Sequence, residues 1–186
     1  MPVKPILKMG HPALTVVSSV VEDPTSAELA ALLQDMRDTL DSVQGIGLAA
    51  PQLGVPLRVV LYCLPPSRIP EGALTKPVPW TALINPTITA LDHEQVHLWE
   101  RCLSLPGLYA RVPRFKRVHV RHQKQDGTWT EFECRGYHAT LLQHECDHLD
   151  GVLYPKRMPD PSELAYASEV CGPTGVFRYT PEDFDG

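Results

Sequence analysis

The stretch Gln143-His144-Glu145-Cys146-Asp147-His148 places a His-Glu-x-x-His pattern inside a segment that we expect to be helical. At 3.6 residues per turn, two histidines four positions apart lie about 40° apart on one helix face, so both can bind the same metal ion. Glu145 follows the first histidine directly, which completes a metal-hydrolase signature. The pattern predicts a central helix that holds a catalytic metal.

This helix has clear expected limits. It begins near Gly136, and Gly151 is a suitable residue to end it. Cys146 lies about 200° round the helix from His144, so it faces away from the histidines and is predicted to be part of the core.

A second helix is predicted over residues 25–43, where apolar residues recur on one face. Thr25 and Glu28 have the spacing of a capping box, and Gly45 is expected to stop the helix. Strands are expected at 58–64, at 82–91 with an interruption at Asn85-Pro86, and twice within 112–134, around a turn at 125–128. The predicted class is α+β, with small antiparallel sheets packed around the metal-binding helix.

Composition limits the kind of protein. The chain has 186 residues, 43% hydrophobic and 21% charged, which fits one compact domain. We expect residues 1–157 to form a single catalytic domain and 158–186 a C-terminal extension, ordered at most in part. The net charge of −5 argues against DNA or an anionic membrane as a partner. No secretory signal or spanning segment is visible, and the five cysteines form no Cys-x-x-Cys pair, so an intracellular protein with reduced thiols is expected.

Residues 111–124 contain six Lys or Arg residues, two His and no acid. A docking stripe for ribosomal RNA is one interpretation, but a solvated strand face is the simpler one in an acidic chain. We therefore treat the segment as surface.

The residues alone leave the third metal ligand open. The extended pattern of one protease class continues to a third histidine, but that position is Tyr154 here. Glu163 and Glu169 follow several prolines, which makes a well-defined ligand position there unfavourable. Cysteine remains as a ligand type, because a thiolate binds borderline and soft metals strongly.

Three segments together resemble a known family. Residues 45–52 read Gly-Ile-Gly-Leu-Ala-Ala-Pro-Gln, residues 100–104 read Glu-Arg-Cys-Leu-Ser, and residues 143–148 carry the histidines. In order and spacing they are similar to the three motifs of the peptide deformylases of bacteria and organelles. The similarity extends to residues 112–114 and over most of residues 5–157.

The resemblance implies a reaction. A deformylase removes the N-formyl group from the initiator formyl-methionine of nascent polypeptides, releasing formate, by metal-activated water with Glu145 as general base. It also implies that Cys102, His144 and His148 hold one divalent metal, commonly iron(II), with zinc, nickel or cobalt able to replace it. Gln52 and the backbone N–H of Leu103 would complete the catalytic group by stabilising the oxyanion.

The resemblance further implies a peptide cleft and a cellular setting. The expected substrate-binding residues are Gly45, Ile46, Gly47, Glu100, Tyr137 and Leu141. Arg101 stands where the family usually has glycine. The basic C-terminal helix of some members is absent, so a transient ribosome contact is left open. The bacterial cytoplasm is the expected location, with an organelle matrix as the alternative.

Two other functions compete. A metallopeptidase or other amidase would use the same metal chemistry but cleave unformylated peptides. A non-catalytic binding protein would have kept the fold and lost the reaction, and the presence of Glu145, Gln52 and Cys102 argues against it.

Overall fold

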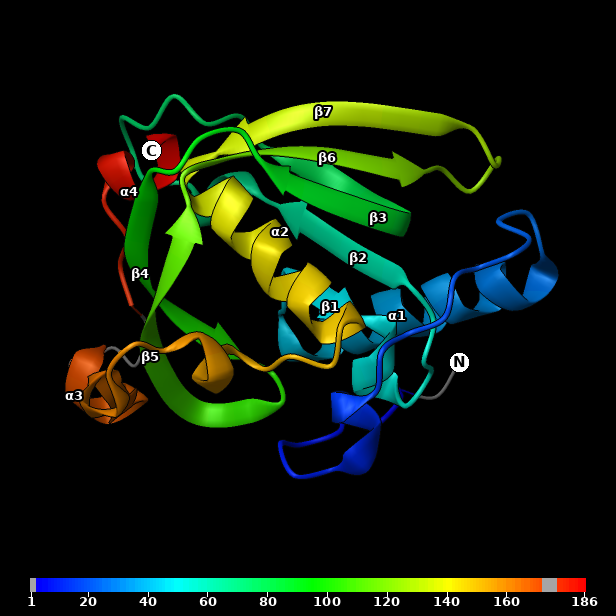
Figure 1. The fold of residues 1–186 in the computed structure, drawn as a ribbon, viewed down its shortest axis with the longest axis horizontal. Helices are drawn as coiled ribbons and strands as arrows, with labels where there is room; N and C mark the ends of the chain where they lie inside the picture. The colour runs from blue at the N-terminus through cyan, green and yellow to red at the C-terminus, as the bar shows by residue number, and fades with distance from the viewer. Residues whose placement is uncertain (1–2, 172–176) are drawn as a thin grey trace.

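The computed structural model describes residues 3–171 and 177–186 and arranges two antiparallel sheets around a central helix (Figure 1). The α-helices in this part of the chain are α1 (Ala27–Val43), α2 (Gly136–Leu149), α3 (Ala167–Val170) and α4 (Pro181–Asp185). The strands are β1 (Gly47–Ala49), β2 (Val59–Leu64), β3 (Val78–Ala90), β4 (Gln95–Cys102), β5 (Leu105–Phe115), β6 (Arg117–Gln123), β7 (Trp129–Arg135) and β8 (Leu164–Tyr166). One sheet has the order β1-β2-β3-β6-β7 and the other β4-β5-β8, which confirms the predicted α+β class.

Helix α2 lies at the centre of the molecule, between the two sheets (Figure 1). Twelve of its 14 residues are buried, including His144, Glu145 and His148. A helix buried on all sides cannot leave charged groups unpaired without cost, so its polar residues must be bonded or functional. The helix ends as predicted, with Gly151 in the left-handed region at φ 67°.

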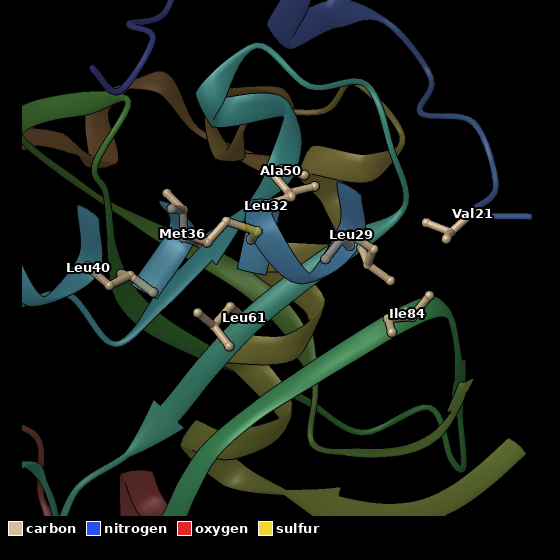
Figure 2. Close-up of a cluster of buried hydrophobic side chains, with 10 residues drawn as sticks. Val21, Leu29, Leu32, Met36, Leu40, Ala50, Leu61 and Ile84 are labelled. Carbon is tan, nitrogen blue, oxygen red and sulfur yellow. The ribbon is translucent and has the colours of Figure 1, made fainter. Parts of the chain in front are cut away.

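Helix α1 covers the outer face of the larger sheet near β2 (Figure 2). Its buried face carries Leu29, Leu32, Met36 and Leu40, which form one cluster with Leu61 of β2. This apolar stripe confirms the helix predicted from the sequence.

The predicted end of α1 at Val43 is confirmed, but its start and its cap residues were wrong. Ser26 is the N-cap, and its hydroxyl accepts a hydrogen bond from the Leu29 N–H at 3.3 Å. Thr25 instead bonds Asp23, because that carboxylate accepts from both the backbone and the hydroxyl of Thr25. At the other end Gln44, at φ 51°, ends the helix one residue before Gly45.

The predicted strands are present as β2, β3, β6 and β7, although β3 begins earlier, at Val78, and residues 112–115 belong to β5. Strands β1, β4, β5 and β8 were not predicted. The interruption expected at Asn85-Pro86 is an irregularity in β3, where the register to β6 shifts between Ile84 and Thr87 and Asn85 has φ 51°. The hairpin expected around 125–128 joins β6 to β7.

The C-terminal residues that the structure describes pack against the body. Strand β8 pairs with β5, and Phe184 of α4 is only 1% exposed. Gly136 allows this approach, because a side chain there would overlap the backbone of Phe184. Within the described residues, no helix is both long and apolar enough to cross a membrane.

Candidate metal centre

Three potential metal ligands converge at the inner face of α2. Cys102 lies at the end of β4, and His144 and His148 lie one turn apart on α2. Their ligand atoms all lie within 4.8 Å of one another, and Cys102 Sγ is 3.3 Å from His148 Nε2. All three residues are buried. The cysteine that the residues alone could not select is thus the one beside both histidines.

The local structure of β4 explains why Cys102 faces the helix. Side chains alternate along a strand, and Leu98, Glu100 and Cys102 are the buried positions of β4. The register to β5 shifts at this point, because Arg101 pairs with Tyr109 whereas Cys102 pairs with Leu105.

Glu100 orients the first histidine. Its Oε2 accepts a hydrogen bond from His144 Nδ1 at 2.8 Å, which leaves the opposite ring nitrogen, Nε2, for a metal. The carboxylate is itself fixed by Arg114, whose Nε and NH2 donate to its two oxygens at 2.7 and 2.9 Å. Burial would raise the pKa of Glu100, but the Arg114 charge and the hydrogen bonds outweigh it and lower that pKa to about 2.

Arg114 joins this carboxylate to a second one on α2. Its NH1 donates to Asp147 Oδ2 at 2.6 Å, and Arg157 donates to both oxygens of Asp147. The prediction that residues 111–124 form a solvated surface was therefore wrong for Arg114, which is only 3% exposed. The Arg114 side chain points inward because side chains alternate along β5, and Val112 and Arg114 both lie on its buried face.

The donor set fits a divalent cation. Two imidazoles and a thiolate are typical ligands for zinc or iron in proteins. Burial opposes a positive charge on His144, yet its contacts with Cys102 and Glu100 raise its pKa well above the ordinary value. The surroundings therefore favour positive charge at this point. By contrast, burial and the neighbouring His144 charge lower the pKa of His148, so its neutral ring has a lone pair to offer.

Glu145 lies beside the centre in a buried position. Its Oε2 is buried and has no hydrogen-bond partner among the described residues. Burial raises the pKa of Glu145 to about 7. Gly47 makes room for this carboxylate, because a Cβ at that position would overlap Oε1. The glycine at position 47 is thus explained by the close approach of the Glu145 carboxylate to its backbone.

Gln52 projects from the same segment toward Cys102. Its Oε1 accepts from the Ala49 N–H at 2.9 Å, which fixes the orientation of the amide. The amide nitrogen therefore points into the site, 3.1 Å from Ser104 Oγ and 3.6 Å from Cys102 Sγ.

These groups lie at the floor of a cleft of about 1140 Å³. The cleft is lined by every predicted catalytic and substrate-binding residue, namely Gln52, Leu103, Glu145, Gly45, Ile46, Gly47, Glu100, Tyr137 and Leu141. Glu100 is a special case, because both its oxygens are already bonded to Arg114 and His144. Its contacts in this structure orient the site rather than face the cleft.

Some residues of the site gave no usable sequence signal. The partners of Arg114 are 14 and 33 positions away in the chain, so no spacing rule connects them. The cleft is also lined by Phe177, Arg178, Tyr179 and Phe184 from the C-terminal segment, which was not expected to contribute to the site.

The fold and the site define a metal-dependent hydrolase with a Cys-His-His centre at the floor of a cleft. The family model described as polypeptide deformylase matches residues 3–163. The chain belongs to this family, whose known reaction is the removal of the N-formyl group from nascent peptides.

Individual relatives agree with this assignment. The chain is 45% identical over 172 residues to peptide deformylase 1 of Prochlorococcus marinus, covering 91% of this chain and 88% of the relative. It is also 45% identical to peptide deformylase 2 of Ralstonia nicotianae over 172 residues, with coverages of 92% and 95%.

Solved structures are similar as well. The peptide deformylase of Ehrlichia chaffeensis in complex with actinonin has a TM-score of 0.78 at 32% identity, covering 88% of this chain and 92% of that one. A class I type b peptide deformylase from Acinetobacter baumannii with bound Met-Ala-Ser has a TM-score of 0.77 at 30% identity, with coverages of 84% and 99%.

Proposed function

We propose that this chain deformylates formyl-methionyl peptides with Cys102, His144 and His148 as the ligands of one divalent metal and Glu145 as the general base. The observation that carries the proposal is the convergence of the three ligand atoms within 4.8 Å beside the buried Glu145 carboxylate. Gln52 and the Leu103 N–H are the proposed oxyanion donors.

Iron(II) is the proposed native metal, with zinc, nickel or cobalt able to replace it. When bound, such a metal would act as a Lewis acid that polarises a carbonyl oxygen and makes water more acidic. The thiolate of Cys102 donates more charge than an imidazole, which favours a soft or borderline metal and exposes the sulfur to oxidation. The Glu100 contact holds the His144 ring in the orientation that such binding requires.

Glu145 would move the protons of the reaction. A pKa of about 7 is well suited to a group that must accept and release a proton near neutral pH. It takes a proton from the attacking water while oxygen adds to the formyl carbon. It then gives that proton to the departing nitrogen as the C–N bond breaks, leaving a free amine and formic acid, which loses its remaining proton to become formate.

Gln52 is supported as an oxyanion donor by its fixed orientation. Because Ala49 holds the amide oxygen, the Nε2 group faces the site, where one of its N–H groups would exchange its contact with Ser104 Oγ or Cys102 Sγ for the oxyanion. Leu103 follows Cys102 directly, so its N–H is proposed as the second donor on the basis of the family resemblance.

The cleft suits an extended peptide that begins with methionine. Strand β1 is the end strand of its sheet, with β2 as its neighbour, and Gly47 of β1 lines the cleft. A peptide backbone could therefore pair with this edge as an added strand. Ile46, Tyr137 and Leu141 line the same cleft and are proposed to contact the methionine side chain.

The test is formate release from formyl-Met-Ala by protein loaded with iron(II) without oxygen, with acetyl-Met-Ala and unformylated Met-Ala-Ser as comparison substrates. Formate from the first substrate alone is expected. Cleavage of the peptide bond in Met-Ala-Ser would indicate a peptidase instead, and the absence of any reaction in metal-loaded protein would indicate a binding protein.

A bacterial cytoplasm and transient contact with the ribosome are proposed from the reaction itself, because formylated chains emerge there. Cosedimentation of the purified protein with translating ribosomes, compared with vacant ribosomes, tests the contact. Equal or absent pelleting with both would contradict it.

A further inference from the structure

Basic side chains surround the mouth of the cleft. Four residues from four separate segments line it, namely Lys8, Arg68, Arg101 and Arg178. The acidic residues that line the same cleft are Glu100 and Glu145, and both are buried at its floor. Positive charge therefore dominates the entrance of a chain whose net charge is −5.

These four charges are not neutralised by neighbours. Within residues 3–171 and 177–186, no carboxylate forms an ion pair with any of them. Lys8 Nζ donates to the Leu103 carbonyl at 2.9 Å, and Arg68 donates to the Gln44 carbonyl at 3.0 Å. The remaining residues of the chain, 1–2 and 172–176, include no Asp or Glu. Neutral acceptors therefore hold the side chains of Lys8 and Arg68 in place and leave their charge available.

The C-terminal segment that carries Arg178 is attached on both sides of that residue, and on the N-terminal side the Phe177 ring lies 6.5 Å from the rings of Trp99 and Tyr109. The Tyr179 hydroxyl donates to the Trp99 carbonyl of β4 at 2.6 Å, and the Phe184 ring stacks on Tyr137 of α2 at 4.5 Å. Asp185 accepts hydrogen bonds at 2.8 Å from the backbone N–H groups of Leu74 and Thr75. Figure 1 shows this segment running beside β4 toward α4.

Arg101 and Arg178 belong to the same side of the cleft. Arg101 pairs with Tyr109 across β4 and β5, and the Tyr109 ring lies 6.5 Å from the ring of Phe177, the residue before Arg178. Tyr179, the residue after Arg178, donates to the Trp99 carbonyl on β4, two positions before Arg101. Both arginine side chains are exposed, so they can meet a peptide that leaves the cleft.

A cleft lined by charges of one sign concentrates its field at the opening. A peptide whose first residue lies beside Glu145 at the floor must carry its next residues past this opening. Carboxylate side chains there would be attracted and ammonium groups repelled, more strongly at low salt.

We propose that the mouth of the cleft selects formyl-methionyl peptides with acidic residues after the methionine, and that Arg101 and Arg178 determine this preference. Arg178 lies outside residues 3–163, the part matched by the family model. The preference is thus a property of this chain's own residues. The proposed preference rests on the proposed function in one respect, namely that the peptide substrate binds in this cleft.

The experiment compares three C-terminally amidated peptides, formyl-Met-Ala-Glu, formyl-Met-Ala-Gln and formyl-Met-Ala-Lys, by kcat/KM at low and high salt. Exposed ion pairs are individually weak, so the Glu peptide is expected to exceed the Lys peptide by roughly three- to tenfold at low salt. The Gln peptide should lie between them, and high salt should reduce the ratio.

Variants locate the effect. In the double variant Arg101→Gln/Arg178→Gln, the kcat/KM for the Glu peptide divided by that for the Lys peptide should fall to near one. In Arg178→Glu the same ratio should be lower than in the wild type, because the new carboxylate favours the Lys peptide. Lys124→Gln on the exposed hairpin removes the same charge away from the cleft and should leave the ratio unchanged. A wild-type ratio near one, or an equal change in Lys124→Gln, would overturn the proposal.

Binding of the unformylated products separates this proposal from the proposed function. Calorimetric titration with amidated Met-Ala-Glu and Met-Ala-Lys needs no turnover, so it reports the preference even if no formate is released. Tighter binding of the Glu peptide that is lost in the double variant supports the proposal. Equal binding of both peptides would refute it, whatever the outcome of the formate assay.

Discussion

Removing the buried guanidinium of Arg114 should destabilise the protein more than any surface charge does. Arg114→Met keeps much of the side-chain volume but removes the guanidinium. That group lies 2.7 Å from the Glu100 carboxylate and 2.6 Å from the Asp147 carboxylate, so both lose this partner. Loss of one member of a buried ion pair typically costs about 3–5 kcal/mol. The lowered pKa of Glu100 has the same sign, because the Arg114 charge and hydrogen bonds favour the ionised carboxylate against its burial.

Urea unfolding of metal-free protein at pH 7 measures this cost. Arg117→Met is the matched control, since Arg117 also faces two carboxylates, at 3.8 and 3.6 Å, but is 53% exposed. It should lose less than about 1 kcal/mol. The sign of the pKa shift adds a second check. Because the folded pKa of Glu100 is lowered, its contribution should be present above pH 4.5 and be lost as the pH falls toward 2.

The double variant Arg114→Met/Glu100→Gln distinguishes a lost ion pair from lost packing. It removes the stranded charge, so it should be more stable than Arg114→Met alone. If Arg114→Met unfolds within 1 kcal/mol of the wild type, or if the double variant is less stable than the single one, the inferred network does not stabilise the fold.

Three further predictions concern the site itself. Cys102→Ala should lower bound metal well below one ion per chain while Cys146→Ala does not, as metal analysis of purified protein would show; the reverse result would contradict the ligand assignment. Gly47→Ala should displace the Glu145 carboxylate and lower kcat about 100-fold with metal content unchanged, so near-normal turnover would argue against this close approach. In metal-free protein, the pKa of Glu145 is higher in the folded state than in the unfolded state, so ionisation of this carboxyl destabilises the fold. As the pH rises from 4.5 to 8, the free energy of unfolding of the wild type should therefore fall by up to about 3 kcal/mol relative to that of Glu145→Gln. Parallel urea curves for the two proteins across that range would refute the shift.

Regular patterns made much of the fold predictable. The apolar stripe of α1 and the alternation around the β6–β7 turn depend on local periodicity, and both appear where expected. The capping error at Thr25 has a local cause too, because Asp23 competes for that side chain and leaves Ser26 as the cap. Such competition between neighbouring short polar residues is not decided by spacing.

The site was predictable only where one element carries several of its residues. His144 and His148 share a helix face, so their spacing predicts a metal site without any three-dimensional information. Cys102 lies 42 positions before His144 on a different element, and the residues alone could not select it among five cysteines. The family resemblance supplied that choice, and the structure places its sulfur beside His148.

The remaining parts of the site depend on long-range packing. Arg114 belongs to a basic segment that resembles an exposed strand, and its burial follows from two carboxylates on other elements. Arg178 lies in a tail rich in proline and acids, and it reaches the cleft because Phe184 docks onto Tyr137. Neither contact leaves a periodic signal in the sequence.

The most direct test of the central claim is the rate of formate release from formyl-Met-Ala by Glu145→Gln, divided by the wild-type rate, at equal measured metal content. The substitution keeps Cys102, His144 and His148 and removes the group that is proposed to accept the proton. General-base catalysis of this kind typically raises a rate by about 100- to 10,000-fold. The ratio of the variant rate to the wild-type rate should therefore be about 0.01 or lower. A ratio above about 0.1 would contradict the account, because the metal ligands would then suffice without the base.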